Sequence, residues 1–169
     1  MHNSVLQEVT NVLKNFATPN TEVFSDIEGH QVNGGTIPAD VIVTGGQGSK
    51  PDLVIVNRTD KKIALMELTC LHFNSADKAH QKKLGDYTQL KLDLSAEGFS
   101  VVLMLFEVLS SGHITNRTRT NIRNTLRLFN MNPRKDLFEN MAKISLLCTM
   151  SIFYAYQVNE WIDPPLLSP

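Results

Sequence analysis

Two acidic residues, Asp52 and Glu67, border two short apolar segments of the sequence. Asp52 precedes Leu53–Val56, Glu67 lies within Ile63–Leu68, and the polar segment Arg58–Lys62 separates the two. Apolar, β-branched runs on either side of a polar turn predict a β-hairpin. Such a hairpin would bring the two carboxylates to the same end of a sheet, where they could act together.

The register of this hairpin sets the distance between the two carboxylates. If Asn57 and Ile63 flank the turn, Asp52 lies opposite Leu68 and within one residue of Glu67. Directly paired residues hold their Cβ atoms about 5 Å apart, so the two charges would repel each other. A divalent cation would offset this repulsion, and oxygen ligands suit Mg²⁺ or Mn²⁺, which can activate water for phosphodiester hydrolysis. In the alternative interpretation, Asp52 simply starts a strand and Glu67 is exposed or salt-bridged.

A helix expected over residues 75–94 offers polar side chains that could serve the same site. His80, Lys83 and Tyr87 follow the spacing i, i+3, i+7, which places them on one face of the helix. Because the helix begins shortly after Glu67, it can pack back across the hairpin. Lys83 could then orient an attacking water or offset phosphate charge, and Tyr87 could hydrogen-bond to a phosphate or to Lys83. The alternative is an amphipathic surface helix whose lysines are solvated.

Three segments in this order resemble the core of the PD-(D/E)xK nucleases. They are Pro51-Asp52, Glu67-Leu68-Thr69 after fourteen intervening residues, and the helical segment Ala79–Tyr87. More narrowly, they are similar to the restriction-like endonuclease domains of retroelements. The resemblance covers about residues 38–108 and implies a restriction-endonuclease-like mixed β-sheet flanked by helices. It also implies an endonuclease that cuts DNA and binds Mg²⁺ or Mn²⁺ through Asp52, Glu67 and the Leu68 carbonyl.

The sequence departs from the family pattern at one position. The lysine that usually follows the glutamate by two residues is Thr69 here, and a hydroxyl cannot supply a positive charge. The resemblance implies that a lysine from the next helix can take over, which makes Lys83 the candidate, ahead of Lys82 and Lys78. His80 and Tyr87 would then be supporting groups in catalysis. If no lysine reaches the site, the chain would instead be a catalytically inactive nucleic-acid-binding domain with the same fold.

The superfamily often adds a metal-binding acid from its first helix, which is expected here over residues 3–16. Glu8 shares the apolar face of this helix, an unusual place for a surface acid. Glu8 is therefore either a metal ligand or a boundary glutamate beside the apolar stripe. Asp40 is a rival acid because Pro38-Ala39-Asp40 is similar to Pro51-Asp52. It ranks lower because no second acid lies at the corresponding position one strand later.

A basic segment over residues 110–135 could bind nucleic acid. It contains six basic residues and no acidic ones, in a chain whose net charge is −1. Arg119, Arg123 and Arg127 follow the spacing i, i+4, i+8 and form one stripe of a helix, and Arg117 lies nearby. Arginine suits phosphate, and such a stripe would follow a nucleic-acid backbone, with DNA expected more than RNA. The alternative is a solvated helix face.

The order of predicted elements indicates an α/β or α+β fold with a mixed sheet in a single domain over residues 1–169. A helix comes first, then several strands, a helix, a strand and two further helices. The continuous apolar run Phe99–Val108 predicts a central strand. The core would span about residues 3–108, and a helical extension would follow over about 115–160.

The composition is typical of a soluble globular protein, with 169 residues, 42% apolar and 20% charged. Two cysteines are too few for a disulfide framework or a zinc site. The sequence has no secretory signal and no apolar run of the roughly 20 residues that a membrane span needs. These features predict an intracellular protein, cytoplasmic or nuclear, that does not associate with a membrane.

The last predicted helix is more apolar than the edge of a small sheet requires. It should bury its apolar residues against the core or against a second copy of the chain, which favours a homodimer. In the alternative, the chain is a protein-interaction domain that dimerises through this helix and cuts nothing. The residues concerned are Ile144, Leu147, Cys148, Ile152 and Phe153.

Overall fold

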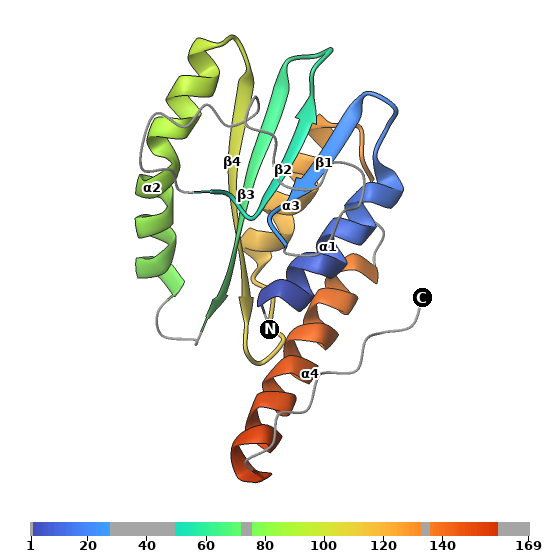
Figure 1. Ribbon diagram of the computed structural model, residues 1–169, viewed down its shortest axis with the longest axis vertical. Coiled ribbons are helices and arrows are strands. Elements are labelled where there is room, and N and C mark those ends of the chain that lie inside the picture. Colours follow the sequence, from blue (N-terminus) through green and yellow to red (C-terminus); the bar gives the residue numbers. More distant parts are fainter. Residues whose placement is uncertain (1, 28–49, 72–75, 133–135, 159–169) are drawn as a thin grey trace.

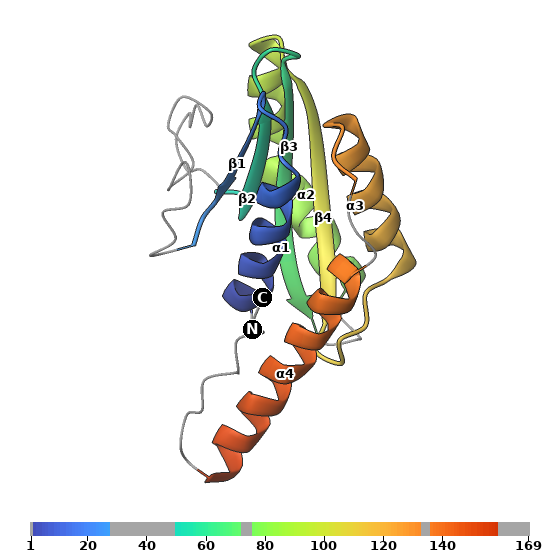
Figure 2. The same cartoon turned by 90° about the vertical axis from the view of Figure 1, so that its right-hand side faces the viewer.

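A four-stranded mixed sheet forms the centre of the molecule, with helices packed on both of its faces (Figures 1 and 2). The structure is a computed structural model in which residues 2–27, 50–71, 76–132 and 136–158 are described. The strand order is β1-β2-β3-β4; β1, β2 and β3 pair antiparallel, and β3 pairs parallel with β4. The α/β class with a mixed sheet, predicted from the sequence, is confirmed. The strands are β1 Thr21–Ser25, β2 Leu53–Asn57, β3 Lys62–Leu71 and β4 Ser100–Leu109.

The helices divide between the two faces of the sheet. α2 covers one face, and α1, α3 and α4 cover the other (Figures 1 and 2). None of the helices in the described part of the chain has the length and hydropathy needed to cross a bilayer. One of the several strands expected after the first helix, over residues 39–44, lies outside the described residues. The helices are α1 His2–Phe16, α2 Ala76–Ala96, α3 Asn116–Leu128 and α4 Asp136–Val158.

Alternation along β3 builds a separate apolar core on each face of the sheet. Ile63 and Leu65 point toward the α2 side, whereas Ala64 and Met66 join the larger core beneath α1, α3 and α4. The C-terminal helices expected as an extension contribute to this larger core, for example through Phe138. Glu67 continues the α2-side series, so its carboxylate lies at the end of a row of core side chains.

The β2–β3 pairing places Asp52 beside Glu67. Leu53 pairs with Met66 and Asn57 with Lys62, one residue away from the register assumed for the sequence. The observed register, continued by one residue, sets Asp52 opposite Glu67 rather than opposite Leu68. Lys61 closes the turn in a left-handed conformation with a φ of 48°, which lets Lys62 enter the ladder directly.

The prediction that Phe99–Val108 forms a central strand is wrong for the strands that the structure describes. β4 is the outer strand of the four, next to β3 alone. Its continuous apolar pattern has another cause, because helices cover both of its faces. Val101 and Leu103 pack on the α2 side, and Phe106 lies in the opposite core.

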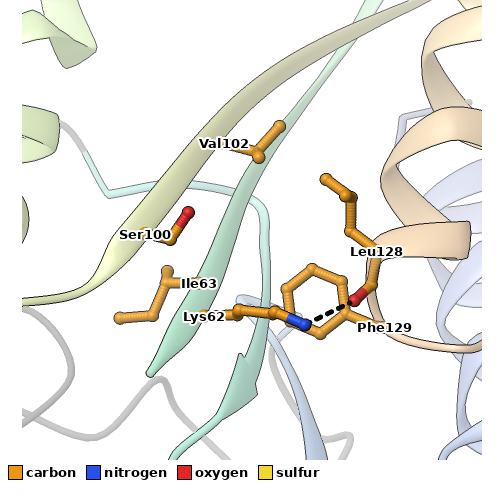
Figure 3. A pocket seen from close by; sticks show the side chains of 6 residues that line it. All are labelled: Lys62, Ile63, Ser100, Val102, Leu128 and Phe129. Atoms are coloured by element: carbon orange, nitrogen blue, oxygen red, sulfur yellow. Dashed lines mark hydrogen bonds between the residues drawn. The ribbon is translucent and has the colours of Figure 1, made fainter. Parts of the chain in front are cut away.

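A small hollow marks the end of the sheet away from Asp52 and Glu67 (Figure 3). There Lys62 Nζ donates a hydrogen bond of 3.4 Å to the Leu128 carbonyl and so caps the C-terminus of α3. α3 therefore starts near the carboxyl ends of β3 and β4 and ends near their amino ends. The hollow is lined by Lys62, Ile63, Ser100, Val102, Leu128 and Phe129.

The second half of α4 carries an exposed apolar surface. Cys148 is buried, but Ile152 and Phe153 are 47% and 58% exposed. Burial of these two side chains against the chain's own core, one of the two outcomes expected from the sequence, does not occur. Leu146, Met150 and Tyr154 are also exposed, and Figure 1 shows this part of α4 extending beyond the sheet. A second copy as the covering surface stays a prediction.

If α4 forms the dimer contact, the Phe153→Glu variant should be monomeric under conditions in which the parent is a dimer. A buried charge without a partner opposes association, whereas the variant monomer keeps its core. Light scattering at micromolar concentration measures both species. Lys143→Glu, at another exposed position of α4, is the control and should leave the dimer intact. A parent that is monomeric throughout rules the dimer out.

Candidate functional site

Asp52 and Glu67 meet at one end of the β2–β3 hairpin. The Asp52 backbone N–H lies 3.4 Å from Glu67 Oε2, and the Leu68 N–H donates to Asp52 Oδ2 at 2.8 Å. The Glu67 side chain is 5% exposed and that of Asp52 is 17% exposed. The hairpin thus brings together the two acids predicted from the sequence, with Glu67 buried and Asp52 partly buried.

Two side chains from α2 hold the Glu67 carboxylate. The Lys83 ammonium forms an ion pair with Glu67 Oε1, and the Tyr87 hydroxyl lies 2.7 Å from Glu67 Oε2. The same hydroxyl lies 2.8 Å from the Lys50 carbonyl oxygen, and Tyr87 is 1% exposed. Lys83 therefore approaches the acid as the helix spacing predicts, whereas Tyr87 contacts Glu67 and not Lys83. The side chain of His80 lies outside the described residues.

These contacts change the proton affinity of both α2 side chains. Burial alone would lower the pKa of Lys83, but the hydrogen bond and charge of Glu67 outweigh it and raise that pKa above its usual value. Burial, assisted by Glu67, raises the pKa of Tyr87 far above its usual range. Lys83 is therefore a fixed cation and Tyr87 a fixed neutral donor at any pH near neutrality.

A histidine from α1 completes the site from the opposite face of the sheet. His2 Nε2 lies 3.1 Å from Asp52 Oδ2 and 3.3 Å from the Leu68 carbonyl oxygen. The hydrogen bond to Asp52 raises the pKa of His2, although partial burial opposes the shift. The sequence interpretation missed this residue. Helical spacing contains the signal, because His2 shares the stripe of Leu6 and Val9, which are both buried.

Glu8, the acid proposed from the first helix, is not brought to the carboxylate pair. Its Oε1 accepts a hydrogen bond of 2.9 Å from Asn140 Nδ2 on α4. Glu8 follows His2 by six positions. On an α-helix this step is about 9 Å along the helix axis and about 120° around that axis. The α1 side chain at the site is therefore His2. The rival acid, Asp40, lies outside the described residues.

The donor atoms at this site fit a divalent cation by type. Asp52, Glu67 and the Leu68 carbonyl supply oxygen, and His2 supplies an imidazole nitrogen that faces both Asp52 and that carbonyl. In the described part of the chain, no three His, Cys, Asp or Glu side chains already stand at metal-ligand spacing. The Glu67 oxygens already accept hydrogen bonds from Lys83 and Tyr87, so a cation would have to use their remaining lone pairs or displace one of these partners.

The four arginines proposed to bind nucleic acid do not share one environment. The guanidinium carbons of Arg119 and Arg123 stand 5.2 and 5.1 Å from the ring centre of Phe138, each in cation–π contact. Arg127 is exposed near the end of α3 that is far from the acids. Arg117, at the start of α3, is bonded to the buried Glu107. Phosphate binding by this stripe stays a prediction.

Comparison with known proteins adds little to this geometry. No family model matches the sequence, and no curated protein matches it. Among solved structures, the N-terminal domain of a reptarenavirus L protein is similar at a TM-score of 0.44 and 14% sequence identity. The match covers 94% of this chain and 67% of that one. The functional interpretation therefore rests on the residues of the site.

In the metal-free protein, the Asp52→Asn substitution should lower the pKa of His2, measured by NMR titration of its imidazole. Because Asp52 raises that pKa in the folded state, the pair stabilises the fold below the usual histidine pKa. This contribution is lost as the pH rises through the raised value. Glu22→Gln, at an exposed acid that pairs with Arg58, is the control. An unchanged His2 titration in Asp52→Asn would contradict the assigned hydrogen bond.

Proposed function

We propose that this chain is a metal-dependent endonuclease that hydrolyses phosphodiester bonds in DNA. One observation carries the proposal: a buried glutamate stands beside a second acid and is paired with a lysine from the following helix. A hairpin needs no such group for its stability, since a buried ion pair is at best a weak stabiliser. The residue types of this group, Asp52, Glu67 and Lys83, agree with those of the PD-(D/E)xK nucleases that segments of the sequence resemble.

Lys83 answers the main objection to this proposal. Thr69 stands where the family usually has lysine, and the hydroxyl carries no charge. In the structure, the Lys83 ammonium contacts the same glutamate from α2. A lysine from either element would place its charge next to Glu67. The positive charge that Thr69 cannot supply is therefore present beside Glu67, which removes the main sequence argument for an inactive nucleic-acid-binding domain.

The residues divide into a set that would bind the metal ion and a cation, Lys83, that would act on the water and the phosphate. Asp52, Glu67, the Leu68 carbonyl and His2 would hold Mg²⁺ or Mn²⁺, which supplies an activated water and neutralises charge on the phosphate. His2 adds a nitrogen donor, which suits a transition ion such as Mn²⁺ better than Mg²⁺. Lys83, released from Glu67, would orient the attacking water or stabilise the developing charge.

Asp52→Asn and Glu67→Gln should each reduce DNA cleavage about a hundredfold or more. Both substitutions keep side-chain shape while they remove the charge that binds the cation. Mn²⁺ affinity, measured by calorimetry without DNA, should fall in both variants. Circular dichroism controls for folding, since Glu67→Gln leaves the Lys83 ammonium without its partner. Cleavage at the parent rate in both variants would refute the assignment of the site.

Lys83→Ala should lower the cleavage rate by orders of magnitude while Mn²⁺ still binds. The reason is that Lys83 would act on water and phosphate and is no metal ligand. Lys82→Ala is the matched control and should cut normally, because Lys82 is exposed and lies about 100° away around the helix. The double variant Thr69→Lys, Lys83→Ala should recover part of the lost rate. A fully active Lys83→Ala protein would remove Lys83 from the mechanism.

A further inference from the structure

A second buried carboxylate lies on the same face of the sheet as Glu67. Glu107 is 1% exposed, and in the parallel β3–β4 pairing it is the partner of Thr69. Paired residues of neighbouring strands point to the same face, and Thr69 shares a face with Glu67. Strand spacings of about 4.8 Å across and about 3.3 Å along place the Glu67 and Glu107 Cα atoms about 8 Å apart. Glu107 thus belongs to the same end of the sheet as the acid pair.

The charge of Glu107 is balanced by Arg117 at the start of α3. Arg117 Nη2 lies 3.2 Å from each of the two Glu107 carboxylate oxygens. The arginine backbone is fixed as well, because Thr115 caps the helix and Thr118 Oγ1 accepts a hydrogen bond from the Glu107 N–H at 3.2 Å. The Glu107 side chain is 2% exposed, but that of Arg117 is 45% exposed. One partner is therefore buried while the other faces solvent.

Stability alone is a weak reason for this ion pair. Removing two charges from water is costly, and apolar residues of similar volume often do as well or better. What an ion pair provides and an apolar pair does not is a guanidinium held in one orientation. Here it is held near the carboxyl end of β4, at the same end of the sheet as Glu67. Without a bound metal ion, a polyanion that approached those acids would be repelled unless another cation stood near them, and Lys83 is engaged by Glu67.

We propose that Arg117, oriented by Glu107, binds a phosphate of the nucleic acid that neighbours the phosphate being cut. This inference rests on the proposed function and adds to it a substrate-binding residue and its positioning residue. Arginine binds phosphate well, because its planar guanidinium offers several donors in a fixed geometry. Arg127 has the same chemistry, but it lies about 15 Å further along α3, toward the opposite end of the sheet.

The test is the affinity for a labelled DNA duplex in EDTA, where binding is measured without cleavage. Arg117→Ala alone would leave Glu107 buried without a cation and could unfold the protein. The informative variant is therefore Arg117→Ala, Glu107→Gln, which removes one charge of each sign and leaves the net charge unchanged. Thermal unfolding shows whether the variant is folded, and Arg127→Ala reports the effect of losing a distant arginine.

We expect the double variant to bind DNA about tenfold more weakly, with the slope of log K against log salt reduced by about one. Arg127→Ala should cause a smaller loss. Arg117→Lys should retain the salt slope but bind more weakly than the parent, because lysine keeps the charge and loses the fixed geometry. If Glu107 orients Arg117, Glu107→Gln should also retain the salt slope and bind DNA more weakly than the parent.

Two outcomes would overturn the inference. One is a folded double variant that binds DNA like the parent, which would make the pair purely structural. The other is a double variant that binds more weakly but with an unchanged salt slope, which would mean that no phosphate contact had been lost. Because binding in EDTA requires no cleavage, a parent that binds DNA and never cuts it would defeat the proposed function while leaving the role of Arg117 measurable.

Discussion

The charge of Glu67 is the constraint around which this end of the molecule is organised. Its carboxylate follows Ile63 and Leu65 on the side of β3 that packs against α2, and it is almost fully buried. An uncompensated carboxylate in such a place would cost several kcal/mol. Lys83 and Tyr87 provide the compensation. The same two contacts therefore fix α2 on the sheet and place the polar side chains of the site.

The parallel pairing of β3 with β4 explains why α2 is available for this task. Parallel neighbours cannot be joined by a tight turn, so the chain must cross over a face of the sheet, as α2 does. The antiparallel β2–β3 hairpin brings Asp52 to the same place from the other side. The candidate site thus lies where a hairpin and a crossover share a single strand, and each contributes part of it.

Local patterns predicted the parts of the structure that depend on local physics. The hairpin, the helix bearing Lys83 and Tyr87, and their approach to Glu67 follow from alternation and helical spacing. The register differed by one residue because the left-handed conformation of Lys61 shortens the turn, and a lysine at that position gives no sign of it.

Features that depend on distant packing were not predictable in the same way. His2 reaches Asp52 only because α1 begins beside Asp52 and the Leu68 carbonyl, and its place on the apolar stripe of the helix does not show which strand it meets. Spacing alone could not show that Arg119 and Arg123 would both contact the Phe138 ring of α4. The sequence did not reveal the outer position of β4, because helices on both faces of a sheet give an edge strand the same apolar composition as a central strand.

The contacts of Tyr87 have a consequence for the rigidity of the site. A phenol has one hydrogen to donate, and here two oxygens, Glu67 Oε2 and the Lys50 carbonyl, compete for it at nearly equal distance. Rotation about a single C–O bond passes the hydrogen from one to the other without moving any heavy atom. The Tyr87 hydroxyl can therefore donate to either oxygen. When Glu67 takes another partner, the hydroxyl can still donate to the Lys50 carbonyl and so hold the backbone that leads into Asp52.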